Sequence, residues 1–213
     1  MITVNTIEAR THGRYLVRRP ATAPPWPVLV GFHGYAETAG DHLDALQTIP
    51  GMERWLLVSV QALHPFYTRT ERVVANWMTR DDRELAIADN VDYVGRVLER
   101  ISVEYETRPP LVFSGFSQGG AMAYRAAVSY PAAGVIILAA DVPPDVAAGG
   151  RLLPPLLVGR GTRDEFYTEV KESADREVLA RKGANVEFCV FEGGHEWTDP
   201  FRDAAARFLR RVT

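Results

Sequence analysis

The pattern with the clearest chemical meaning is Gly-x-Ser-x-Gly at residues 115–119, with Ser117 at its centre. An apolar run at 111–113 precedes it and a run of small residues at 119–128 follows it, which predicts a buried strand, a sharp turn and a helix. This is the arrangement of a nucleophile elbow, a turn so tight that only glycine fits beside the serine. Such a turn points the hydroxyl of Ser117 into a cleft.

A serine hydroxyl is a weak nucleophile at neutral pH, so it needs a base that accepts its proton and a group that orients the base. Of the five histidines, His195 lies between the last apolar run and the last helical pattern, downstream of the elbow, and we interpret it as the base. His33 is the main competitor, but it should lie at the other lip of the cleft. The remaining three are interpreted as surface or loop residues: His12, His42 and His64.

The orienting acid is expected between the serine and the histidine in the chain. Asp164 fits this order, because it follows the apolar run that ends at Gly159. Glu165 beside it and Asp141 after the preceding strand are the alternatives. The order of serine, acid and histidine is then that of the α/β-hydrolases.

Acyl transfer also needs donors for the negative oxygen that develops on the carbonyl. The backbone amide of Gln118 lies at the start of the predicted helix, where a negative oxygen is favoured. We expect the backbone amide of Tyr35, in the turn after the first long apolar run, to be the second donor. Candidates for the wall of an acyl pocket are the aromatic and thioether side chains near these segments: Phe66, Tyr67, Trp77, Met78 and Phe116.

The elements that must position these groups alternate along the chain. Continuous apolar runs predict buried strands at 28–32, 55–60, 111–113, 135–138, 156–159 and 186–191. Helices are expected from about 41–46, 83–104, 119–128, 167–182 and 199–209, and short strands of an antiparallel edge hairpin are expected within 1–20. This alternation predicts a mostly parallel sheet with helices on both faces.

Finer expectations concern helix ends, helix faces and one long loop. The stretch Asp81-Asp82-Arg83-Glu84 is expected to provide an N-cap and a capping box. The 167–182 helix is expected to bury Tyr167, Val170, Ala174 and Val178, and the last helix Phe201, Ala205, Phe208 and Leu209. Residues 61–80 show no clear periodicity but are rich in aromatic residues, which favours a functional loop.

Bulk properties indicate one globular domain over residues 1–213 and exclude several classes of function. The net charge is −3, with 24 basic and 27 acidic residues, so nothing indicates nucleic-acid binding. No apolar run is long enough to span a membrane, and the N-terminus has no secretory pattern. With a single cysteine, Cys189, a cytoplasmic location is expected. No metal-ligand cluster or phosphate-binding loop is present in the sequence, so no cofactor is expected.

The chain resembles the phospholipase/carboxylesterase family, the small α/β-hydrolases that include acyl-protein thioesterases. The resemblance rests on Phe-His-Gly at 32–34, Trp-Met at 77–78, Gly-Phe-Ser-Gln-Gly-Gly at 115–120, Leu-Ala-Ala-Asp-Val-Pro at 138–143, Gly-Thr-Arg-Asp at 161–164 and Gly-His at 194–195. It implies Ser117, Asp164 and His195 as a triad, with the amides of Tyr35 and Gln118 as the oxyanion hole. The chain departs from the family's His-Gly-Leu-Gly-Asp at Tyr35-Ala36-Glu37.

These residues together predict a serine hydrolase that acts on small-molecule carboxylic esters of short or medium acyl chains. A thioesterase, a lysophospholipase or another acyl-bond hydrolase would use the same machinery. A catalytically inactive binding protein is a less favoured alternative, since no triad member is missing. Activity should rise with pH as His195 loses its proton, around ~6.5 for an ordinary histidine.

Overall fold

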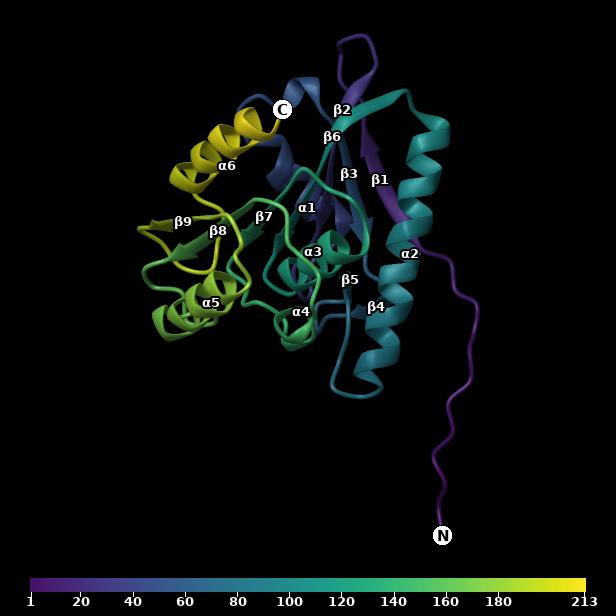
Figure 1. The fold of residues 1–213 in the computed structure, drawn as a ribbon. Coiled ribbons are helices and arrows are strands. Elements are labelled where there is room, and N and C mark those ends of the chain that lie inside the picture. Colours follow the sequence, from purple (N-terminus) through teal and green to yellow (C-terminus); the bar gives the residue numbers. More distant parts are fainter.

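The computed structural model describes residues 1–213, and its main sheet has seven strands in the order β1-β3-β2-β6-β7-β8-β9 (Figure 1). β1 is antiparallel to β3, and every other pairing in this sheet is parallel. The strands are β1 (Arg14–Arg18), β2 (Trp26–Phe32), β3 (Leu56–Gln61), β6 (Thr107–Phe116), β7 (Gly134–Leu138), β8 (Leu156–Gly161) and β9 (Val186–Phe191). All six strands expected from apolar runs are present, and β6 begins four residues earlier than its run.

Helices cover both faces of this sheet. They are α1 (Ala39–Gln47), α2 (Arg83–Glu104), α3 (Gln118–Ser129), α4 (Pro144–Ala148), α5 (Glu169–Arg181) and α6 (Asp199–Val212), with a short 3₁₀ turn, η1 (Met52–Arg54). The α4 helix was not expected from the sequence. Figure 1 shows α2 and α3 in front of the sheet.

Close contacts at three strand glycines show which helices share a face. A methyl group on Gly31 of β2 would meet α1, and one on Gly134 of β7 or Gly159 of β8 would meet α6. The register carries these positions to one face, because paired residues of neighbouring strands point the same way. A methyl group on Gly115, one residue along β6, would instead meet α3. Thus α1 and α6 lie on one face and α3 on the other.

Two sequence predictions for the N-terminal half are wrong. Residues 1–13 form no strand, and β1 pairs with β3 rather than with an N-terminal hairpin partner. Asp82 precedes α2 with φ of 46° and makes no capping bond with its side chain. The capping box lies at α1 instead, where Thr38 and Asp41 bond to each other's backbone N–H groups.

The α5 helix also differs from its prediction. Val170 is 79% exposed, whereas Glu172, Asp175 and Leu179 are buried. Glu172 is buried because it pairs with Arg160 of β8, so an ion pair replaces part of the expected apolar face. The α6 prediction is confirmed: Phe201, Ala205, Phe208 and Leu209 are all buried.

The long segment 61–80 contains a hairpin of two short strands, β4 (His64–Tyr67) and β5 (Val73–Asn76). The hairpin is attached to the segment after β2 by two backbone hydrogen bonds, from Ala36 N to Ala75 O at 3.1 Å and from Ala75 N to Glu37 O at 3.0 Å. This segment therefore braces the turn that follows β2. None of the helices combines the length and apolarity that crossing a membrane requires.

Candidate active site

Ser117 lies in a strained turn between β6 and α3. Its φ of 52° and ψ of −123° form a conformation that residues with a side chain rarely adopt. The flanking glycines are needed for close approach, because a Cβ atom on Gly119 would lie 2.0 Å from Phe32 O and one on Gly115 would lie 2.2 Å from Gly119 O. The turn is held by the hydrogen bond from Ser117 N to Leu138 O, 2.9 Å. This geometry is that of a nucleophile elbow.

His195 and Asp164 meet at the carboxyl ends of β9 and β8. His195 Nδ1 lies 2.9 Å from Asp164 Oδ2 and 3.1 Å from Oδ1. The Asp164 side chain is fully buried, and its Oδ1 also accepts hydrogen bonds from the backbone N–H groups of Phe166 (2.8 Å) and Tyr167 (2.9 Å). These bonds satisfy an ionised carboxylate, which then holds the proton of the imidazole on Nδ1.

The two alternative acids lie elsewhere. Asp141 is at the rim of the cavity, 3.6 Å from Lys171 Nζ, and Glu165 is exposed. Neither is bonded to His195. Only Asp164 is placed to orient this ring.

Ser117 and His195 line one cavity of about 260 Å³. No hydrogen bond joins Ser117 Oγ to the imidazole in this structure, a looseness that is common before a substrate binds. The other lining residues are Met78, Arg83, Gln118, Ala121, Ala139, Ala140, Asp141, Phe166, Tyr167 and Lys171. A larger cavity of about 410 Å³ lies between α4 and the end of α5, but none of the proposed catalytic residues lines it.

The turn after β2 is organised by two side chains whose role sequence reasoning missed. The Glu37 carboxylate accepts the Gly34 N–H at 2.7 Å, and burial raises the pKa of this carboxyl. His33 is fully buried; its Nε2 accepts the Ala62 N–H at 3.0 Å, so its Nδ1 carries the proton and donates to Gly34 O at 2.7 Å. Burial lowers the pKa of His33. His33 is therefore a neutral residue that shapes the turn and is no rival to His195.

The two expected oxyanion donors are the backbone amides of Tyr35, in the turn after β2, and Gln118, at the start of α3. The Gln118 amide begins α3 directly after Ser117. Neither the Gln118 N–H nor the Tyr35 N–H donates to a protein group in the structure, so both remain available to a ligand. The Gln118 side chain joins the site to the 61–80 segment: its Oε1 accepts the Trp77 N–H and its Nε2 donates to Met78 O, both at 2.9 Å.

Of the five candidates for the acyl pocket, only Met78 is among the lining residues of the cavity. Trp77 is fully buried and donates its indole N–H to His33 O at 2.8 Å, so it is a core residue. Phe66 stacks on Tyr35 with ring centroids 5.5 Å apart, and Tyr67 is 74% exposed on the hairpin. Phe116 packs against the His195 ring at 4.9 Å.

Two aromatic cavity residues, Phe166 and Tyr167, were found only from the structure, and Tyr167 is held by a hydrogen bond to a buried carboxylate. Phe166 packs against His195 with ring centroids 4.9 Å apart. Tyr167 donates its hydroxyl to Asp175 Oδ2 at 2.9 Å, and the Val142 N–H donates to the same carboxyl at 3.1–3.2 Å. Burial raises the pKa of Asp175 to about 6. No sequence signal marks the contact between Val142 and Asp175, because it joins segments 33 residues apart.

No family model matches the chain, and no curated protein matches it in sequence. Solved structures do match in shape. Esterase PE8 superposes with a TM-score of 0.75 at 20% identity, covering 94% of this chain and 99% of that one. Zea mays acyl-protein thioesterase 2 gives 0.73 at 19% identity (94% and 99% covered), and the Bacillus cereus carboxylesterase gives 0.76 at 17% identity (94% and 95% covered). The chain has the α/β-hydrolase fold, and the resemblance drawn from its sequence is confirmed at the level of the fold.

Proposed function

We propose that this protein is a serine hydrolase that cleaves small carboxylic esters through an acyl-enzyme intermediate. Ser117 is the nucleophile, His195 the general base and acid, and Asp164 the residue that fixes the imidazole. The observation that carries the proposal is that the strained Ser117 and the Asp164–His195 pair lie at one cavity. The esterases and thioesterase of similar shape are consistent with it.

In the first half of the reaction, Ser117 Oγ attacks the carbonyl carbon while His195 Nε2 takes the hydroxyl proton. The carbonyl oxygen becomes negative and receives hydrogen bonds from the amides of Gln118 and Tyr35. As the C–O bond to the alcohol breaks, His195 returns the proton to the leaving oxygen. The acyl group remains on Ser117 as an ester.

In the second half, His195 takes a proton from a water molecule while the oxygen of that water attacks the acyl carbon. The tetrahedral oxygen uses the same two donors. Collapse releases the carboxylic acid, and His195 protonates Ser117 Oγ. No further group is needed, since protons and bonds balance over the two halves.

The size of the cavity favours short acyl chains. Pockets for drug-sized ligands span roughly 300–1,000 Å³, and this one is about 260 Å³. A thioester or a lysophospholipid would meet the same nucleophile, so both remain second choices that a substrate panel decides. An inactive binding protein is disfavoured, because no member of the proposed triad is missing from the chain and His195 pairs with Asp164.

A fluorophosphonate probe tests the nucleophile. We expect one covalent adduct per chain, mapped to Ser117, and loss of both adduct and ester turnover in Ser117→Ala. Ser129, at the far end of α3, provides the matched control, and Ser129→Ala should keep both. A folded protein that takes no label, or takes it elsewhere, would falsify the enzyme reading.

A further inference from the structure

The cavity is lined by both apolar and charged side chains. Its apolar lining comes from the start of α3, the segment after β7 and the end of the hairpin segment: Ala121, Ala139, Ala140 and Met78. Its charged lining consists of Arg83, Asp141 and Lys171. A wholly neutral ester would offer these charged side chains no ionic partner.

The charges of Arg83, Asp141 and Lys171 do not sum to zero. Lys171 Nζ lies 3.6 Å from Asp141 Oδ2, so these two groups offset each other. Arg83 forms no ion pair and no side-chain hydrogen bond with the protein. The surplus at the cavity is therefore one guanidinium.

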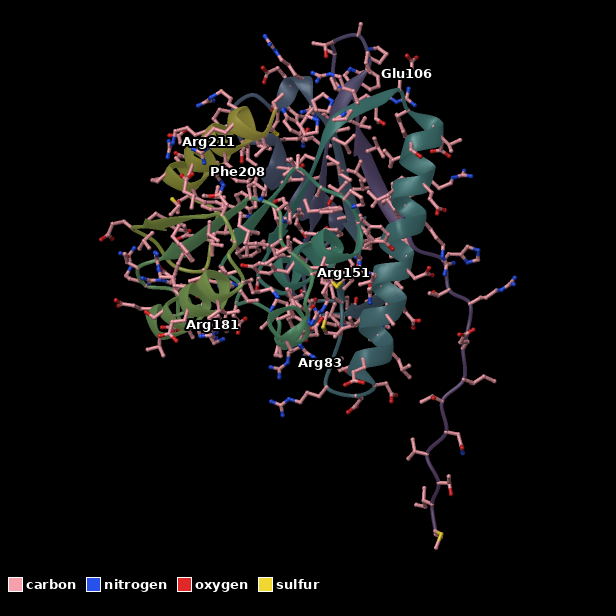
Figure 2. The ribbon with its side chains drawn as sticks, in the orientation of Figure 1. Arg83, Glu106, Arg151, Arg181, Phe208 and Arg211 are labelled. Carbon is pink, nitrogen blue, oxygen red and sulfur yellow. The ribbon has the colours of Figure 1, made fainter.

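One carboxylate in the neighbourhood of Arg83, that of Asp145, is already engaged. Figure 2 shows Arg83 beside α4, the helix that carries Asp145. Asp145 accepts two hydrogen bonds from the buried Arg125, at 2.9 Å and 2.7 Å, and both arginines lower the pKa of Asp145, with Arg125 the main cause. Two positive groups thus face one carboxylate, and the fork of Arg83 remains free for an anion from outside.

Resting on the proposed function, we propose that the preferred substrates are small esters that carry a carboxylate, which Arg83 binds while Ser117 attacks the ester carbonyl. The apolar lining residues contact the methylene chain that joins the ester to the carboxylate of the substrate. The substrate class is then the half-esters of short dicarboxylic acids.

The test compares two chromogenic esters of equal chain length, 4-nitrophenyl hexanoate and the mono-4-nitrophenyl ester of adipic acid. They differ only in a terminal carboxylate. We expect kcat/KM for the adipate ester to exceed that for the hexanoate about 10-fold, as for a hydrogen-bonded charged group. The preference should shrink at 0.5 M NaCl, because Arg83 is exposed.

Arg83→Gln should reduce the ratio of the two kcat/KM values to near one. Arg210, exposed on α6 and absent from the cavity, gives the control: Arg210→Gln should leave both values unchanged. The ratio is measured within one active preparation, so a loss of folded protein does not alter it.

The failures of the two proposals are distinguishable. A wild-type protein that cleaves hexanoate with no preference for adipate overturns the carboxylate inference alone. So does an Arg83→Gln variant that keeps the preference. A protein that cleaves neither ester and takes no fluorophosphonate label overturns the proposed function and this inference together.

Discussion

In the proposed mechanism, a single buried carboxylate, that of Asp164, orients His195 as the base. Asp164 receives three groups at once: the imidazole and two backbone N–H groups. The ring bonds to Asp164 through Nδ1, so its Nε2 is directed away from Asp164.

Asp164→Asn should lower kcat about 10³-fold or more, because an amide can donate as well as accept and no longer fixes the tautomer. The measurement is steady-state hydrolysis of a 4-nitrophenyl ester, with KM expected to change far less than kcat. Glu165→Gln is the control, since Glu165 is exposed beside it. Full activity in Asp164→Asn would remove Asp164 from the triad.

At the scale of elements, the turn after β2 depends on bracing from elsewhere. Glu37 holds the Gly34 N–H, and the hairpin holds the backbone at Ala36 and Glu37. Ala36 itself has φ of 59°, a conformation that costs energy outside glycine. The direction of the Tyr35 amide therefore depends on these contacts.

Glu37→Ala should lower kcat roughly 10-fold or more with little change in KM, because it releases the turn that carries an oxyanion donor. Glu37→Gln keeps an oxygen that can accept the Gly34 N–H, so it should retain most of the activity. Equal loss in both variants would mean that the negative charge, and not the hydrogen bond, is what matters at this position.

At the scale of the whole molecule, a buried histidine links folding to pH. His42 was expected at the surface but is only 1% exposed, and neither ring nitrogen has a hydrogen-bond partner. It packs edge-on to Trp197 with ring centroids 6.0 Å apart. Burial lowers the pKa of His42 to about 3, with a smaller contribution from His33.

Because the folded pKa lies below the ordinary 6.5, the unfolded chain binds more protons between these two values. The free energy of unfolding should therefore fall as pH drops below 6.5, and His42 alone accounts for about 2 kcal/mol at pH 5. Urea titrations at pH 7 and pH 5 should show a smaller loss in His42→Leu than in wild type. His64, exposed on β4, gives the control His64→Leu, which should behave as wild type.

The strands, the helices and the proposed catalytic residues could be predicted because short local patterns in the sequence mark them. Apolar runs identify parallel strands, and the elbow needs glycines at fixed spacing around Ser117. The order of residues along the chain favoured His195 and left Asp164, Glu165 and Asp141 as candidate acids, and the structure places Asp164 in contact with His195.

The predictions that were wrong concern residues whose surroundings are set by contacts between segments far apart in the sequence. Trp77 is a core residue because His33 O, 44 positions away, accepts its indole N–H. His42 is buried because α1 packs its ring against Gly31 of β2 and Trp197 lies beside it, and the buried face of α5 is set by Arg160. The cavity wall was also missed, since it is assembled from segments that no periodicity joins.

Each group of the proposed active site follows a strand at the same margin of the sheet: the 34–37 turn after β2, Ser117 after β6, Asp164 after β8 and His195 after β9. The segments that lead from helices back into strands lie at the opposite margin, and the one at 182–185 contains Gly183, around which there is open space. A tether attached at Gly183 would hold the molecule on a support with the cavity that Ser117 and His195 line facing the solution.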